Sequence, residues 1–302
     1  MAEKGEDYRK YLDPVALAKL GNMELIARLV VEGFLVGLHK SPYHGFSVEF
    51  AEYRQYNPGD PPKTIDWKVF ARTDRFYVKE FEEETNLRSY ILLDKSASMS
   101  FSAGDRLSKF EYAKYFSAAL AYLMVKQKDA VGLLTFDENV DSLVPASMTK
   151  VQLMELLKIL QNTEHSGKTK VDSTFKVLAD KLKRRGLIVL ISDLLDDPER
   201  IISAVKHFRH RKNEVIVFHI LDPVELSFDF KKEAHFIDLE TEKKLPVQPW
   251  MIRDEYRKKA GEFFNLIKYR CQELGVDYNL ITTDYPYDIA LLAYLHKRQM
   301  LW

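Results

Sequence analysis

From about residue 89 onward, short apolar segments rich in β-branched residues alternate with segments of helical periodicity, and this alternation constrains the fold most strongly. It predicts an open α/β fold, in which helices cover both faces of a mainly parallel sheet. The expected strands are residues 89–94, 130–137, 140–146, 186–193, 214–222 and 276–284. The expected helices are residues 106–129, 151–160, 174–185, 196–208, 250–275 and 288–299, and residues 223–249 resemble an irregular hairpin.

The chain has 302 residues, enough for one large domain or for a domain with an extension. We expect an N-terminal extension of helices and a β-ribbon over residues 1–85 and the α/β domain over 86–302. The most apolar window, residues 25–38, contains Arg28 and Glu32 and is shorter than the roughly 20 residues of a membrane span. It predicts an amphipathic soluble helix and no integral membrane segment.

Composition limits the partners and the compartment. Lys plus Arg and Asp plus Glu both number 45, so no net charge favours nucleic acid or an anionic surface. The single cysteine, Cys271, can form no internal disulfide and is expected to pack in a helix. The N-terminus is polar and lacks the apolar core of a secretory signal. Together these features predict a cytoplasmic protein.

Oxygen-bearing side chains lie at the ends of two predicted strands and in one further loop. Asp94-x-Ser96-x-Ser98 ends the first strand, Asp193 ends the strand 186–193, and Thr169 lies in the loop of residues 164–173. Ligands of open α/β sheets bind at the carboxyl ends of parallel strands. Two carboxylates and three hydroxyls form a hard oxygen set suited to Mg²⁺ or Mn²⁺, with Ca²⁺ also possible. Neutral hydroxyl ligands would leave the metal able to bind an outside carboxylate.

This motif, in this order on an α/β pattern, resembles the von Willebrand factor type A domain over roughly residues 85–300. The resemblance implies that Asp94, Ser96, Ser98, Thr169 and Asp193 form a metal-ion-dependent adhesion site. It also implies a non-enzymatic module that binds a protein partner through the metal.

Residues 47–84 resemble the signature of the "domain of unknown function 58" family. The residues that carry the resemblance are Arg54, Tyr56, Gly59, Asp60, Ile65, Asp66 and Trp67. Members of this family often accompany MoxR-type AAA+ ATPases in bacterial operons, which implies an adaptor or partner role in chaperone-like complex assembly. Arg54, Asp60, Asp66 and Trp67 are candidate partner-binding residues; a structural clamp between the ribbon and the sheet is the alternative.

Other interpretations stay open at this point. Asp94, Ser96 and Ser98 could cap the helix that begins near Arg106. A metal-dependent phosphohydrolase could use the same carboxylates, although a phosphatase of the haloacid dehalogenase type would want an aspartate in place of Ser96. A scaffold with an empty site is the third interpretation.

Two further motifs fail. Gly167-Lys168-Thr169 resembles the end of a phosphate-binding loop, but Asn162 stands where that motif needs its first glycine. The histidines show no spacing typical of a zinc centre and are expected to be structural.

Overall fold

The computed structural model describes residues 13–40, 53–56, 65, 67–79, 88–137, 140–165, 185–230, 234–237 and 244–300. Its largest element is a six-stranded sheet with the order β10-β7-β6-β3-β4-β5. The strands are β3 (Arg88–Asp94), β4 (Ala130–Phe136), β5 (Val140–Ser147), β6 (Leu187–Ser192), β7 (Glu214–Leu221) and β10 (Asp277–Thr282). All neighbours are parallel except β5, which pairs antiparallel with β4.

Counted along the chain and read from the β5 edge, these strands follow the doubly wound order 3-2-1-4-5-6. The predicted open, mainly parallel α/β sheet is therefore confirmed, including the antiparallel strand after residue 137. The central strands β4 and β6 are buried along their whole length. Continuous apolar runs are expected for parallel strands that are covered on both faces.

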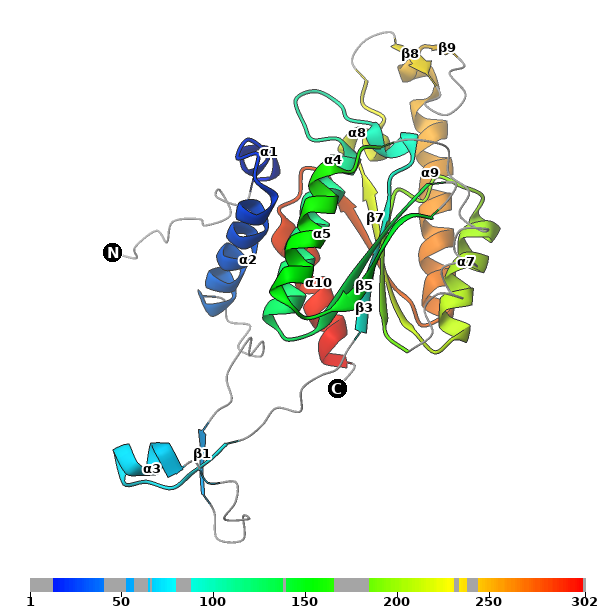
Figure 1. The fold of residues 1–302 in the computed structure, drawn as a ribbon. Helices are drawn as coiled ribbons and strands as arrows, with labels where there is room; N and C mark the ends of the chain where they lie inside the picture. The colour runs from blue at the N-terminus through cyan, green and yellow to red at the C-terminus, as the bar shows by residue number, and fades with distance from the viewer. Residues whose placement is uncertain are drawn as a thin grey trace, which may run out of the picture.

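Helices lie on both faces of the sheet, as Figure 1 shows. One face is covered by α4 (Lys109–Lys126), α5 (Lys150–Asn162) and α10 (Tyr287–Met300), and the other by α7 (Pro198–His210) and α9 (Pro249–Glu273). Alternate residues of a strand point to opposite faces, so Ile91 and Leu93 join the first core and Leu92 joins the second. Cys271 of α9 is buried in the second core, as expected.

The N-terminal helices add to the first face. After the short α1 (Pro14–Ala18), α2 (Met23–Lys40) packs against α4 and also contacts α5 and α10. Ile26, Val30 and Phe34 of α2 belong to the same buried cluster as the sheet residues of that face. The predicted amphipathic helix is confirmed, and none of the helices in the described ranges is long and apolar enough to cross a membrane.

A second, small unit lies within residues 53–79. β1 (Tyr53–Gln55) and β2 (Tyr77–Lys79) form the predicted antiparallel ribbon, and α3 (Trp67–Thr73) lies between them in the sequence. Phe70 of α3 stacks on Phe76 with ring centroids 4.4 Å apart.

The segment 223–249 contains a hairpin, as predicted, formed by β8 (Ala234–Ile237) and β9 (Lys244–Val247). It begins with a short helix that the sequence pattern did not predict, α8 (Pro223–Ser227), held by a capping box between Asp222 and Glu225. The predicted helix of residues 174–185 lies outside the described residues apart from Arg185.

Candidate functional site

Four of the five predicted metal-site residues, Asp94, Ser96, Ser98 and Asp193, lie where the sheet reverses its winding. β3 and β6 are neighbours in the sheet, yet the chain leaves β3 toward β4 on one side and reaches β6 on the other. Such a switch point creates a crevice at the carboxyl ends of the two strands. Asp94 is the last residue of β3, and Asp193 directly follows the last residue of β6.

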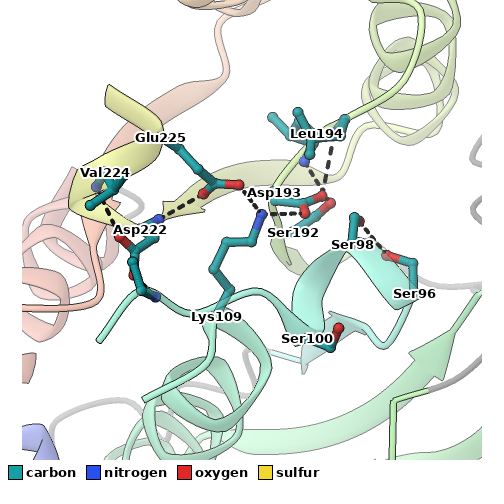
Figure 2. A network of polar contacts seen from close by, with 12 residues as sticks. Ser96, Ser98, Ser100, Lys109, Ser192, Asp193, Leu194, Asp222, Val224 and Glu225 are labelled. Atoms are coloured by element: carbon teal, nitrogen blue, oxygen red, sulfur yellow. Dashed lines mark hydrogen bonds and ion pairs between the residues drawn. The ribbon is translucent and has the colours of Figure 1, made fainter. Parts of the chain in front are cut away.

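Both carboxylate oxygens of Asp94 are held by neighbours. The Ser192 hydroxyl donates to Oδ2 at 2.6 Å, and the backbone N–H of Ser96 donates to Oδ1 at 2.9 Å. The Ser96 and Ser98 hydroxyl oxygens are 3.1 Å apart. Figure 2 marks this contact with a dashed line. The bond between Ser192 and Asp94 joins the ends of β3 and β6. The bond from the Ser96 N–H to Asp94 fixes the turn that follows β3.

The capping interpretation of this motif is wrong for α4. That helix begins at Lys109, and its N-cap is Ser108, whose hydroxyl accepts from the Glu111 N–H at 3.1 Å. Ser96 instead precedes a short 3₁₀ turn, η3 (Ala97–Ser100), and its side chain makes no capping bond there.

The electrostatics of Asp94 are set by burial and by a second carboxylate. Asp94 and Asp193 are almost completely buried. Burial, followed by the negative charge of Asp193, raises the pKa of Asp94 to about 7, and the hydrogen bonds from Ser192 and Ser96 oppose that rise. Two carboxylates therefore share a site that disfavours a second negative charge.

A buried lysine, absent from the predicted set, contacts this site. Lys109 Nζ donates to Asp193 Oδ2 at 2.8 Å and to Glu225 Oε1 at 2.7 Å (Figure 2). Its side chain is fully buried. Burial lowers the pKa of Lys109, but the two carboxylates outweigh burial and raise it above its usual range. Lys109 is the first residue of α4, where the macrodipole disfavours a positive charge, but no sequence signal pointed to it because the predicted helix began at residue 106.

A second ion pair connects the loop after η3 with the end of β7. Asp222 accepts from Arg106 Nη2 at 3.0 Å and from the Ala103 N–H at 3.1 Å. Asp222 also donates its own N–H to Glu225 Oε2 at 2.8 Å, so Glu225 connects this pair to Lys109. The polar network thus ties α4, β6 and α8 together around the site.

The donor set fits a magnesium-type ion. Asp94, Ser96, Ser98 and Asp193 offer carboxylate and hydroxyl oxygens, which Mg²⁺ prefers. With all groups ionised, Asp94, Asp193 and Glu225 carry three negative charges against one positive charge on Lys109, so a divalent cation would neutralise the cluster. Thr169 lies outside the described residues.

Within the described ranges, no three His, Cys, Asp or Glu side chains gather to hold a metal. The predicted set does not require three, because it combines two carboxylates with hydroxyls.

His219 of β7 is buried, and burial lowers its pKa to about 4. Its Nδ1 lies 2.7 Å from the Tyr278 hydroxyl.

Two of the four predicted partner-binding residues, Arg54 and Trp67, lie in the small N-terminal unit. Arg54 pairs with Val78 in the β1–β2 ribbon. Trp67 begins α3, is 57% exposed and packs edge to face on Phe70 and Phe76. Asp60 and Asp66 lie outside the described residues. A partner-binding role for these four residues stays a prediction.

Comparison with solved structures finds similar folds at low sequence identity. BatB from Bacteroides thetaiotaomicron aligns with a TM-score of 0.48 and 14% identity, over 72% of this chain and 100% of that chain. The VWA domain of SpRpn10 aligns with a TM-score of 0.41 and 13% identity, over 71% of this chain and 95% of that chain. Both are similarities of fold alone.

Sequence comparison identifies relatives and a family. The uncharacterized protein Rv1480 of Mycobacterium tuberculosis (strain H37Rv) is 27% identical over 260 residues, which are 82% of this chain and 79% of that protein. The model of the DUF58 family, described as "protein of unknown function DUF58", matches residues 52–262, well over half of the chain. The chain therefore belongs to the DUF58 family, as the resemblance of residues 47–84 predicted.

Proposed function

We propose that this protein is a non-enzymatic interaction module whose metal site binds an acidic side chain of a partner protein. Asp94, Ser96, Ser98, Thr169 and Asp193 would hold the metal, Mg²⁺ in the first instance. One observation carries the proposal: Asp94 and Asp193 are buried together at the switch point, and the charge of Asp193 raises the pKa of Asp94. This is an arrangement that a divalent cation would relieve.

The described residues around the carboxylates have roles that follow from their contacts. The metal, when bound, supplies an electrophilic position for a carboxylate oxygen. Ser192 orients Asp94 through its 2.6 Å hydrogen bond, and the Ser96 N–H holds the other oxygen. Lys109 and Glu225 form an ion pair beside Asp193, so this pair adds no net charge to the site. These hydrogen bonds and the ion pair would thus hold the Asp94 and Asp193 carboxylates in place before a partner binds.

The partner we propose is a MoxR-type AAA+ ATPase, and this choice rests on the family resemblance. Its acidic side chain would enter the crevice between the ends of β3 and β6. The work of the pair would be assembly of a further protein complex.

Calorimetric titration of the full chain with Mg²⁺, Mn²⁺ and Ca²⁺ tests the metal site. We expect saturable binding by the wild type and none by Asp94→Ala, with circular dichroism showing that both are folded. Asp254→Ala is the matched control, because the Asp254 side chain is 92% exposed on α9. Equal binding by all three proteins, or by none of them, would overturn the metal proposal.

Binding of the MoxR-type ATPase from the same genome tests the partner. We expect a complex in Mg²⁺ that chelator and Asp94→Ala both abolish. Metal-dependent turnover of a phosphate ester such as p-nitrophenyl phosphate, lost in Asp94→Ala, would favour the phosphohydrolase alternative instead.

A further inference from the structure

An apolar groove lies beside the candidate metal site, between α9 and the loop that follows β6. Its volume is about 480 Å³. Its lining includes Leu195, Asp196, Tyr256, Ala260, Phe263 and Phe264. The Leu195 side chain is 50% exposed, so half of this apolar side chain in the groove lining is accessible to a ligand.

The loop after β6 connects the groove with the site directly. Asp193 and Leu195 are two residues apart, so their Cα atoms are separated by at most about 7 Å. The Leu195 N–H donates to Asp193 Oδ1 at 3.3 Å, and the Leu194 N–H donates to the Ser192 hydroxyl at 3.0 Å. Leu194 has a φ of 50°, a left-handed conformation that costs a leucine free energy, and its side chain is buried. The same contacts therefore fix the Asp193 carboxylate and the position of Leu195.

A second connection runs through α9. The Tyr256 hydroxyl, on the groove lining, donates to the backbone oxygen of Glu225 at 2.9 Å. The Glu225 side chain accepts from Lys109, which also binds Asp193. The groove and the site thus share one polar network, and a partner that binds one of them lies next to the other.

The chemistry of the lining selects an apolar side chain. The Tyr256 hydroxyl is already bonded, and Lys259 at the groove is paired with Glu255 at 2.7 Å. Asp196 Oδ1 accepts from the Asp197 N–H at 2.7 Å, and Asp196 Oδ2 is a single buried acceptor without a hydrogen-bond partner among the described residues. A small polar ligand normally needs several convergent polar groups, whereas a leucine, methionine or phenylalanine side chain needs only apolar surface. The candidate metal site next to the groove would instead bind a carboxylate, because a divalent cation would lie there.

We propose that the groove binds a large apolar side chain of the protein that supplies the carboxylate to the metal site. The partner segment therefore carries Asp or Glu with Leu, Met or Phe within four residues, the spacing that two neighbouring anchors allow in an extended or helical segment. This inference rests on the proposed function. It adds the apolar partner side chain that would make the metal site select one partner segment among those that carry a carboxylate.

Selection of random peptides displayed on phage, against the immobilised full chain in Mg²⁺, tests the proposal. We expect the enriched peptides to contain the acidic and apolar pair. Synthetic copies of these peptides are then measured by fluorescence anisotropy against Leu195→Asp and Ala260→Leu. The first variant places a charge at the groove and the second fills it, so each should weaken binding at least about tenfold.

The matched control is Leu266→Asp, a change at a 42% exposed leucine of α9 outside the groove lining, which should leave peptide binding unchanged. Magnesium titration should give the wild-type metal affinity for Ala260→Leu and Leu266→Asp, because neither change lies in the loop that carries Asp193. Enriched peptides without the pair, or equal peptide binding by Leu195→Asp, Ala260→Leu and wild type, would overturn the groove inference.

The failure of this inference is distinguishable from failure of the metal site. Peptide binding that chelator and Asp94→Ala abolish, but that both groove variants retain, overturns the groove and keeps the proposed function. Peptide binding that survives chelator and Asp94→Ala overturns the proposed function, and with it the pairing of groove and metal.

Discussion

At the scale of single residues, the protonation of Asp94 links the site to stability. Its pKa rises from 3.8 to about 7 in the folded protein, first because it is buried and then because Asp193 is near. The folded protein therefore holds this proton more tightly than the unfolded chain does. As the pH rises from about 4 to about 7, the unfolded chain releases the proton first, so the free energy of unfolding falls. Well above pH 7, Asp94 is ionised in both the folded and the unfolded protein, and the free energy of unfolding falls no further from this group.

Asp94→Asn should remove this loss in metal-free buffer. The amide keeps an oxygen for the Ser96 N–H and has no charge to repel Asp193. We expect the variant to be more stable than the wild type at pH 8 by about 2–4 kcal/mol, and the difference to shrink as the pH falls toward 4. Urea denaturation between pH 4 and 8 measures it. The exposed Asp254→Asn should show no such pH dependence; a difference for Asp94→Asn that is constant with pH would contradict the pKa argument.

Lys109 is the counter-ion of the site, and its removal should make stability depend on metal. Lys109→Met leaves the Asp193 and Glu225 carboxylates without their shared cation. Breaking a buried ion pair on one side costs about 3–5 kcal/mol. We expect this loss without metal, and a larger gain in unfolding free energy on adding Mg²⁺ than the wild type shows.

Lys126→Met is the control for this prediction, because it makes the same change in the last turn of the same helix. Its unfolding free energy should change by less than about 1 kcal/mol, with or without Mg²⁺. If Lys109→Met and Lys126→Met are equally stable, Lys109 does not balance the charge of the carboxylates.

At the scale of elements, three helices end in the same way before a strand. After α4, the N–H groups of Lys128 and Asp129 bond to the oxygens of Val125 and Met124. This is the Schellman pattern, in which the first residue after the C-cap adopts a left-handed conformation. Lys128 has a φ of 61°, Lys212 after α7 has 60°, and Gly275 after α9 has 66°. Glycine is the favoured residue there, so two of these turns carry avoidable strain.

Lys128→Gly and Lys212→Gly should each stabilise the fold. Both residues are exposed, and relief of the left-handed conformation is worth about 1 kcal/mol. Thermal and urea unfolding of each variant measure the gain. Lys126→Gly, inside α4, is the opposite control and should cost about 1 kcal/mol. A loss of stability in both C-terminal variants would show that their lysine side chains contribute more than the turn costs.

The sequence predicted the elements whose signal is local. The strand 186–193 is a continuous apolar run, and Pro198 after two aspartates predicted the start of α7, where Asp197 is the cap. α8 was missed because a helix of five residues has too few positions for a periodic pattern. Lys109 was missed as a site residue because its carboxylates come from β6 and α8, far away in the chain. The closeness of Asp94, Ser96, Ser98 and Asp193 could be predicted because strand ends converge in a parallel sheet, and their role as metal ligands stays a prediction.

At the scale of the whole molecule, the sheet separates two cores. The first joins α2, α4, α5 and α10 to one face, and the second joins α7 and α9 to the other (Figure 1). The site lies at the end of β3 and β6, two strands that contribute side chains to both cores. A substitution that destabilises either core therefore destabilises the strands that carry the site. Helix α2, as part of the first core, supports the site in this way.

Ile26→Ala should test whether α2 and the sheet unfold together. Ile26 is fully buried in the first core, and truncation of such a residue costs about 2–5 kcal/mol. Trp250 lies in the first turn of α9, the helix whose later part packs in the second core, and its fluorescence can be isolated by replacing Trp67 and Trp302 with Phe. We expect the urea midpoints from Trp250 fluorescence and from far-UV circular dichroism to fall together. Leu29→Ala, at a 37% exposed position of α2, should shift both midpoints much less. An unchanged Trp250 midpoint beside an earlier loss of helix signal would mean that α2 unfolds by itself, and that the sheet supports the site without it.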